Sequence, residues 1–291
     1  MPKITHSRAR KPEWLKTRLR ATQELPLVRN AIREMNLHTV CHEARCPNRN
    51  LCFSQGHATF LILGDTCTRN CAFCAIRNGT PAPPDADEPR NVAQAAAQMK
   101  LKYAVITSVT RDDLDDGGAT HFAHTVECLR ETLPGAGVEV LTPDFQGNRR
   151  ALQTVLDECP DVFNHNVETV PRLYSAVRPQ ADFARSIAVL EYAAHNSTSI
   201  AKSGFMLGLG ETRDEVHRLM DNLRASGVEI LTIGQYLQPS PNNLPVARYV
   251  PPNEFDEYAE FGEKRLGFRR VFAGPFVRSS FMAEDIYAQL K

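Results

Sequence analysis

The chain has 291 residues, of which 42% are hydrophobic and 23% charged, so it is long enough for one large α/β domain with extensions. Its longest apolar runs fall far short of a membrane span, and no apolar segment near Met1 resembles a secretory signal. The composition therefore excludes a membrane-spanning protein and predicts an ordinary globular one.

The formal net charge is zero, but the charges are unevenly distributed. Residues 1–20 hold seven basic side chains against one acidic side chain, Glu13, so the rest of the chain carries the balancing negative charge. Such a basic arm can attract nucleic acid, an acidic protein or a membrane surface, or it can be a solvated terminus. An organelle transit peptide is disfavoured, because the arm is not enriched in Ser and contains Pro2 and Pro12.

Eight cysteines are present, and six of them fall within 34 residues. Such crowding favours metal binding in a reducing compartment over disulfides, and the cytoplasm is the simplest such compartment. The eight are Cys41, Cys46, Cys52, Cys67, Cys71, Cys74, Cys128 and Cys159.

The first three cysteines follow a lead-in, residues 12–40, that we expect to be mostly helical. Their spacing is C-x4-C-x5-C, and no regular helix or strand would place all three on one face. We therefore expect a loop wrapped around a ligand, with Pro47 and Asn48 shaping its turn. Zinc completed by His42 or His57 is one interpretation, and an iron–sulfur cluster short of one ligand is the favoured one.

The next three cysteines follow a short run rich in β-forming residues, 59–64, which predicts a buried strand. Cys67, Cys71 and Cys74 have the spacing C-x3-C-x2-C, and three neighbouring thiols cannot all pair as disulfides. Thiolates suit zinc or iron–sulfur centres, and structural zinc requires four ligands. A cubane held by three cysteines would leave one iron open, so this loop predicts an active site.

Beyond a Pro-rich and acidic connector at 77–89, predicted helices and strands alternate. A capping box at Thr212 and Glu215 opens one helix, Gly227 ends it, and Asn253 is the expected N-cap of the last one. The predicted helices occupy 92–99, 122–133, 152–159, 183–194, 213–226 and 253–266. The predicted strands occupy 103–109, 138–141, 162–167, 200–207, 228–233 and 271–277.

With strand 59–64 this pattern gives six β-α units, which predict a parallel sheet with right-handed crossovers. Six units are too few for a closed eight-stranded barrel, so an open partial barrel or a doubly wound sheet is expected. In both folds the ligand lies at the carboxyl ends of the strands, where the loop 65–74 also falls. Cys128 and Cys159 are expected to face the core.

At two places the sequence resembles the radical S-adenosylmethionine (SAM) superfamily. Residues 67–74, CTRNCAFC, match its CxxxCxΦC motif, with Phe73 as the aromatic residue. Residues 204–211, GFMLGLGE, resemble its GxIxGxxE motif, which contacts the SAM adenine, with Met206 in place of Ile. Within the superfamily the chain is similar to the lipoyl synthase family from about residue 30 to 285. The stretches that carry this likeness are the 41–52 cysteine motif, 163–169 (FNHNVET) and 274–281 (GPFVRSSF).

The resemblance implies a partial (β/α)6 TIM-like barrel at 58–267, an N-terminal extension at 1–57 and a C-terminal segment at 268–291. It also implies two [4Fe–4S] clusters, one of which binds SAM through Cys67, Cys71 and Cys74. The auxiliary cluster would be held by Cys41, Cys46 and Cys52 and completed by Ser280, the second Ser of an RSSY motif. From the residues alone the fourth ligand stays open among His42, Ser54, Cys128 and Ser280.

Two further expectations concern residues around these motifs. Phe281 stands where the family usually has Tyr, which puts a neighbouring hydrogen bond in doubt but not the ligation. SAM contacts are expected at strand ends, although each such residue could be a capping or ladder residue instead. These candidates are Thr107, Ser108, Asn166, Glu168, Gly204 and Met206.

The implied activity is that of a radical SAM sulfurtransferase. It inserts two sulfur atoms, at C6 and C8 of an octanoyl chain on a lysine, and the auxiliary cluster is the sulfur donor. SAM acts as co-substrate and is cleaved to methionine and a 5′-deoxyadenosyl radical. The implied partners are an octanoylated lipoyl carrier domain (E2 subunits or the glycine cleavage H protein) and a one-electron donor such as ferredoxin or flavodoxin. No nucleic acid and no membrane are expected.

Three alternatives remain open from the residues. The first is another radical SAM enzyme with an auxiliary cluster, which would insert sulfur into RNA or mature a peptide. The second is an electron-transfer protein with two clusters, whose spectra SAM should leave unchanged. The third is a zinc-stapled binding domain, which should be colourless. Neither of the last two explains the six β-α units and the 204–211 stretch.

Overall fold

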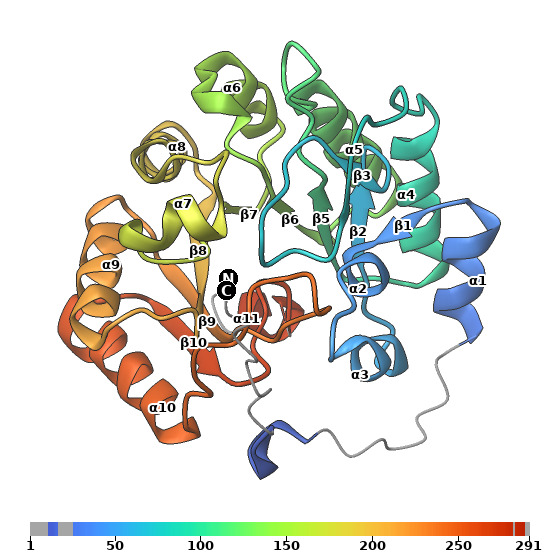
Figure 1. The fold of residues 1–291 in the computed structure, drawn as a ribbon. Coiled ribbons are helices and arrows are strands. Elements are labelled where there is room, and N and C mark those ends of the chain that lie inside the picture. The colour runs from blue at the N-terminus through green and yellow to red at the C-terminus, as the bar shows by residue number, and fades with distance from the viewer. Residues whose placement is uncertain (1–10, 17–25, 282, 289–291) are drawn as a thin grey trace.

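The fold is an open arc of parallel strands with helices on its outer side (Figure 1). The computed structural model describes residues 11–16, 26–281 and 283–288, so the basic arm lies largely outside the described residues. One sheet has the strand order β1-β2-β5-β6-β7-β8-β9-β10, and only the edge pair β1–β2 is antiparallel. Because the parallel strands follow chain order without a switch point, the sheet is a partial barrel and not a doubly wound sheet.

The strands lie where the apolar, β-branched runs predict them, although several end earlier than expected. All four residues of β2 and five of the six residues of β5 are buried, as is usual for parallel strands covered by helices. The main sheet contains β1 (His38–Thr39), β2 (Thr59–Ile62), β5 (Tyr103–Ser108), β6 (Gly137–Leu141), β7 (Val162–Asn164), β8 (Ile200–Leu207), β9 (Ile230–Gln235) and β10 (Arg270–Gly274). A small second sheet pairs β3 (Thr66–Cys67) with β4 (Arg77–Asn78).

The outer layer consists of amphipathic helices whose apolar faces cover the sheet. On α9, four side chains that include Val216 and Leu219 are fully buried, each adding at most about 2 kcal/mol of transfer free energy. The outer helices are α4 (Glu88–Gln98), α5 (Ala119–Thr132), α6 (Arg149–Asp157), α8 (Phe183–Asn196), α9 (Arg213–Ala225) and α10 (Pro252–Glu260). The remaining helices are α1 (Pro26–Glu34), α2 (Val40–Glu43), α3 (Arg49–Ser54), α7 (Tyr174–Val177) and α11 (Ala283–Ala288).

Two predicted helix signals are confirmed and one is wrong. Thr212 and Glu215 form the capping box at the start of α9, and Gly227 adopts φ +88° just beyond its end. Asn253, however, is not the N-cap of α10, because that helix begins one residue earlier, at Pro252, with Pro251 as its N-cap. Proline suits this first turn because its φ is already helical and its missing N–H would have no helical partner there.

Two predictions about cysteines also need correction. The segment from Cys41 to Cys52 is not purely a loop: Cys41 lies on α2, Cys52 on α3, and Cys46 in the turn between them. The Thr39 hydroxyl starts α2 by accepting a hydrogen bond from the His42 N–H at 3.3 Å. Cys128 is buried as expected, whereas Cys159 is exposed in the turn after α6, where its φ is +49°.

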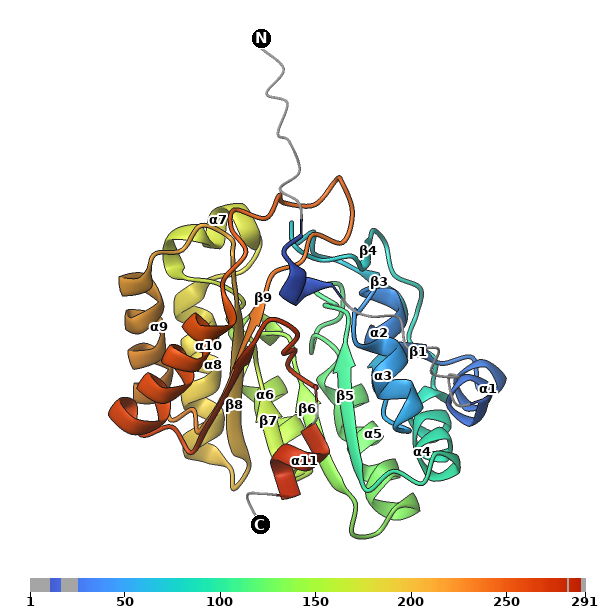
Figure 2. The ribbon, with the colours of Figure 1, turned by 90° about the horizontal axis from the view of Figure 1, so that it is seen from below.

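The last described helix, α11, lies at the end of the barrel where the strands begin (Figure 2). Tyr287 of this helix contacts Tyr103 of β5, with ring centroids 4.9 Å apart. Beside Tyr103 a fully buried ion pair joins Lys202 to Glu139 at 2.9 Å. This end of the barrel is therefore covered by α11 and by the Tyr103 side chain. Among the described residues, no helix is long and apolar enough to cross a membrane.

Candidate functional site

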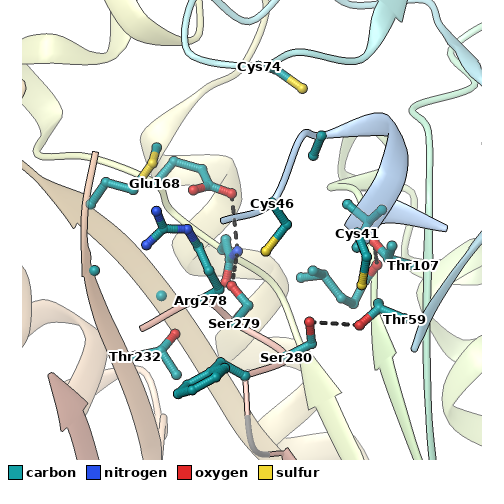
Figure 3. A pocket seen from close by; sticks show the side chains of 18 of the residues that line it. Cys41, Cys46, Thr59, Cys74, Thr107, Glu168, Thr232, Arg278, Ser279 and Ser280 are labelled. Atoms are coloured by element: carbon teal, nitrogen blue, oxygen red, sulfur yellow. Dashed lines mark hydrogen bonds between the residues drawn. The ribbon is translucent and has the colours of Figure 1, made fainter. Parts of the chain in front are cut away.

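A cavity of about 570 Å³ is lined by the carboxyl ends of the parallel strands and extends inward to Tyr103 and α11. The residues that the resemblance assigns to the clusters and to SAM all line this cavity, whereas the other candidates for the fourth ligand, His42, Ser54 and Cys128, do not. The lining residues are Cys41, Cys46, Cys52, Cys67, Cys71, Cys74, Thr107, Ser108, Asn166, Glu168, Gly204, Met206 and Ser280. Segments more than 200 residues apart in sequence thus meet around one space, as the close-up of the cavity shows (Figure 3).

The loop with Cys67, Cys71 and Cys74 is anchored by a buried guanidinium. Arg69, whose side chain is 4% exposed, donates to Asp112 at 2.6 and 2.8 Å and to the fully buried Asp144 at 2.7 and 3.0 Å. Burial alone would raise the pKa of Asp144, but the hydrogen bonds and charge of Arg69 lower it to about 2. Asp144 is thus ionised at neutral pH and fixes the loop to the barrel.

The other side of the same loop is held by the long β9–α10 connection. The Asn243 side-chain amide donates to the carbonyls of Ala72 and Cys74 at 3.2 and 2.7 Å. Backbone N–H groups also point at two of the thiols: those of Arg69 and Thr110 reach Cys67 Sγ, and that of Ile76 reaches Cys74 Sγ. These donors favour thiolate, which is the form that binds a metal.

Burial opposes ionisation of Cys71 and Cys74. It raises the pKa of Cys74 to about 12 despite the Ile76 N–H, and it raises the pKa of Cys71 despite the charge of Arg178. These two thiols therefore stay protonated until a cation replaces the protons, so ligand binding and proton release are coupled at this site.

The C-terminal segment 275–281 packs beside the second set, Cys41, Cys46 and Cys52. Asn48 donates to the Phe276 carbonyl at 2.7 Å, and Thr59 Oγ1 donates to Ser280 Oγ at 2.8 Å. Burial raises the pKa of Cys41 to about 11 and that of Cys52 to about 12. The structure thus places Ser280 on the same side of the cavity as Cys41 (Figure 3).

The same segment passes so close over β9 that only glycine fits there. A Cβ added to Gly234 would lie 2.2 Å from the Val277 carbonyl oxygen. Arg278, the next residue, is half-buried near Glu168 and Cys46, and desolvation lowers the pKa of its guanidinium against the attraction of both groups. The C-terminal segment is therefore packed into the cavity wall.

Asn166 lies between the two cysteine sets. Its side-chain amide nitrogen is 2.6 Å from Ser279 Oγ and 3.1 Å from Glu168 Oε1. Its backbone carbonyl accepts a hydrogen bond from Arg178 at 2.9 Å. The positive charge of Arg178 in turn lowers the pKa of the Cys71 thiol against the effect of burial. Hydrogen bonds through Asn166 therefore connect Arg178 with the segment that carries Ser280.

Several buried polar atoms at this cavity have no hydrogen-bond partner among the described residues. They are Ser108 Oγ, Thr142 Oγ1, His165 Nε2, Asn166 Oδ1 and Arg178 Nε. Because an unpaired buried polar atom costs about 1–3 kcal/mol, such a group of atoms points to a polar ligand that pairs them. At Gly204, moreover, an added Cβ would meet Thr232 Oγ1 at 2.3 Å, so the wall closes tightly there. An amino-acid-bearing nucleoside such as SAM fits this lining.

The donor sets also fit iron–sulfur clusters. Each set offers three thiols, which suit iron or zinc. Within the described part of the chain, no group of three or more His, Cys, Asp or Glu side chains is placed to hold one metal ion. A cubane binds each ligand at a different iron atom, so its ligands need not converge on one point.

Sequence reasoning missed several residues around this cavity. His165 and Arg278 lie inside stretches that carried the family resemblance, although neither was given a role. Arg178 and Asn243 lie in segments without any motif, and only the charge of Arg178 near Cys71 and the hydrogen bond of Asn243 to the Cys74 carbonyl reveal them. Burial lowers the pKa of His165 to about 4, so its ring is neutral at neutral pH.

Comparison with known proteins first defines the class. Residues 61–223 match the model of the radical SAM superfamily, so fold, cysteine loop and sequence agree on a radical SAM enzyme. Among solved structures, a maturase of the [FeFe]-hydrogenase superposes with a TM-score of 0.58 at 12% identity, covering 87% of this chain and 63% of that one. Methylornithine synthase gives 0.54 at 14% identity, covering 73% and 63%. At such identity both likenesses show the fold alone.

The comparison then defines the family. Residues 1–46 match the N-terminal domain of lipoyl synthase of the radical SAM family. The lipoyl synthase of Chlorobium chlorochromatii is 52% identical over 276 residues, covering 94% of each chain. That of Methylococcus capsulatus is 52% identical over 278 residues, covering 95% of this chain and 86% of its own. The chain belongs to the lipoyl synthase family, an enzyme family of lipoate biosynthesis that carries a SAM-binding cluster and an auxiliary cluster.

Proposed function

We propose that the two cysteine sets divide the lipoyl synthase reaction between them. Cys67, Cys71 and Cys74 hold the [4Fe–4S] cluster that binds SAM. The auxiliary cluster, which gives up sulfur to C6 and C8 of a protein-bound octanoyl-lysine, is held by Cys41, Cys46, Cys52 and Ser280. The observation that carries this proposal is the position of Ser280, whose Oγ accepts a hydrogen bond from Thr59 beside Cys41.

When bound, SAM and its cluster supply the one-electron chemistry that removes hydrogen from an unactivated carbon, which no side-chain base can do. The chain itself binds, orients and shields. Arg69 and Asn243 hold the cysteine loop from two sides, and the packed C-terminal segment keeps water from the wall near Cys46. Serine oxygen is a harder ligand than thiolate, which suits a cluster that is taken apart during turnover.

The SAM contacts belong to the same proposal. Thr107, Ser108, Asn166 and Glu168 offer hydrogen-bonding groups, while Gly204 and Met206 form the wall on β8. Ser108 Oγ and Asn166 Oδ1 support this role because both are buried and unpaired among the described residues. Glu168 supports it too, since its φ of +66° is a conformation that non-glycine residues rarely adopt.

Three parts of the chain serve this function in the proposal. The extension 1–57 carries the auxiliary motif, the barrel 58–267 carries the SAM site, and the segment 268–291 supplies Ser280. The substrate is an octanoylated carrier domain, of E2 subunits or of the glycine cleavage H protein. Ferredoxin or flavodoxin is the kind of protein that delivers the electron. The reduced cysteines fit a cytoplasmic location.

The acyl chain should dominate binding of the carrier. Burying about seven methylenes at about 0.8 kcal/mol each contributes roughly 5 kcal/mol. A single exposed ion pair between the basic arm and a carrier contributes at most about 1 kcal/mol. If deleting residues 1–20 abolished binding while shortening the acyl chain did not, this division would be wrong.

The test is anaerobic reconstitution with iron and sulfide, followed by mass spectrometry of an octanoyl-lysine peptide incubated with SAM and a reductant. The peptide should gain two sulfur atoms while 5′-deoxyadenosine is released. Ser280→Ala should lose sulfur insertion, whereas Ser54→Ala, which removes another hydroxyl near Cys52, should retain it. An unchanged octanoyl peptide after both clusters have assembled would contradict the proposed function.

A further inference from the structure

Thr59 contacts two of the proposed ligands of the auxiliary cluster. It is the first residue of β2, it is 4% exposed, and it lies in register with Val105 of β5. Its hydroxyl donates to Ser280 Oγ at 2.8 Å, and its backbone N–H lowers the pKa of the neighbouring Cys41 thiol against the effect of burial. A rigid strand thus reaches the auxiliary site through this residue (Figure 3).

Ser280, by contrast, lies on a turn and depends on other elements for its position. Asn48 binds the Phe276 carbonyl, Asn166 binds the Ser279 hydroxyl, and Gly234 lets the Val277 carbonyl approach. These contacts hold the course of the segment, but they leave the χ1 rotamer of Ser280 undetermined among three staggered positions. In the described part of the chain, the hydrogen bond that reaches Ser280 Oγ comes from Thr59.

We propose that Thr59 is a positioning residue for the auxiliary cluster, and that its hydroxyl holds Ser280 Oγ in the orientation that binds iron next to Cys41. A serine oxygen has two lone pairs, so the hydrogen bond from Thr59 occupies one and leaves the other for the metal. This inference rests on the proposed ligation by Ser280. It goes further because it assigns the orientation of that ligand to a residue of the barrel.

A purely structural role for Thr59 would have different consequences. A buried hydroxyl must find an acceptor, and its removal would then lower the stability of the protein without changing the iron environment. Thr125 of α5 provides the matched case, since it is fully buried and its hydroxyl donates to the His121 carbonyl at 2.7 Å. Replacing either Thr by Val preserves the shape of the side chain and removes the hydroxyl.

The experiment compares Thr59→Val, Thr59→Ser, Ser280→Ala and Thr125→Val in the full chain, reconstituted with ⁵⁷Fe. Mössbauer spectra report the oxygen-bound iron, and a chelator reports how fast iron leaves the auxiliary cluster. Thr59→Val should reduce the oxygen-bound iron signal and speed iron release about fivefold, since one neutral hydrogen bond is lost. Thr59→Ser should restore both values, and Thr125→Val should match the unchanged protein.

The outcomes separate this inference from the function on which it rests. If Ser280→Ala removes the oxygen-bound signal but Thr59→Val leaves it intact, Thr59 does not position the ligand and the inference falls while the ligation stands. If Ser280→Ala changes nothing, the ligation itself fails and the inference fails with it. Should Thr59→Val not fold, Thr59→Ala removes the same hydrogen bond without a branched side chain. The Mössbauer signal of the oxygen-bound iron in that variant then tests the inference.

Discussion

The two cysteine sets face one cavity but are built in different ways. Cys67, Cys71 and Cys74 lie on a loop that buried barrel groups hold from several sides, among them Asp144 through Arg69. Cys41 and Cys52 lie on helices of four and six residues, too short to be stable alone, and a segment from the other end of the chain completes their site. The barrel thus preorganises one set, whereas the other is assembled from the flanking segments.

This difference suggests a division between a permanent site and an open one. A site preorganised by buried charges resists local opening, while a site built from short helices and a docked segment can open at lower free energy. The barrel loop suits a cluster that must survive many turnovers. The set of Cys41, Cys46 and Cys52, here called the flanking set, suits a cluster that gives up sulfur atoms and has to be rebuilt.

Removing one thiol from each set should separate their tasks and give the largest effect. Cys74→Ala should abolish both 5′-deoxyadenosine release and sulfur insertion. Cys46→Ala should keep 5′-deoxyadenosine release and lower sulfur insertion at least about a hundredfold, because a direct ligand should matter at least as much as its supporting groups. Both products are measured by mass spectrometry, with Cys159→Ala, an exposed thiol, as control. If both variants lost SAM cleavage equally, the two sets would not be functionally distinct.

Breaking the buried anchor of the barrel loop should cost stability. Asp144→Ala leaves one side of the buried Arg69 guanidinium unpaired, and we expect a loss of about 3 kcal/mol in the free energy of unfolding. Asp112→Ala should cost less, since the Asp112 side chain is 27% exposed and water can replace it. Denaturant unfolding of the cluster-free protein measures both. Equal costs for the two variants would show that burial does not decide the anchor's strength.

The free energy of unfolding should also decrease at acid pH because of His165, which lines the barrel side of the cavity. Burial lowers its pKa from 6.5 to about 4 in the folded chain, so between these values the unfolded state binds the proton and the folded state does not. Stability contributed by this group is therefore complete above pH 6.5 and decreases by up to about 3 kcal/mol as the pH falls to 4. His165→Gln should flatten this dependence in pH-dependent unfolding of the cluster-free protein. An unaltered slope would show that His165 is not the titrating group.

The barrel could be predicted from sequence because its elements are long and periodic. The strand β8 was predicted residue for residue, and α9 was marked by its capping box. The helices α2 and α3 escaped prediction because fewer than two turns show no period. The predicted site residues do share one cavity, yet contacts such as Arg69 with Asp144, 75 residues apart, depend on the tertiary fold and leave no local pattern.

Crowding the C-terminal segment should disturb the flanking set alone. In Gly234→Ala the new Cβ would lie 2.2 Å from the Val277 carbonyl oxygen, which has to move and carry Ser280 with it. An overpacking cost of about 1–3 kcal/mol corresponds to a loss of sulfur insertion of about 5- to 150-fold, with SAM cleavage retained. Gly274→Ala is the control, because its Cβ would meet Val277 at an ordinary 3.4 Å. Equal losses of both products would contradict a local effect.

The smallest effect is expected from Phe281→Tyr, which restores the residue usual in the family. Phe281 lines the cavity, but its backbone N–H already donates to the Arg278 carbonyl at 3.0 Å, and Ser280 Oγ is held by Thr59. The turn and the ligand are therefore fixed without a ring hydroxyl. One added hydrogen bond contributes about 0.5–1.5 kcal/mol, so sulfur insertion should change by less than about tenfold. A larger gain would mean that this hydroxyl, and not Thr59 alone, orients the flanking site.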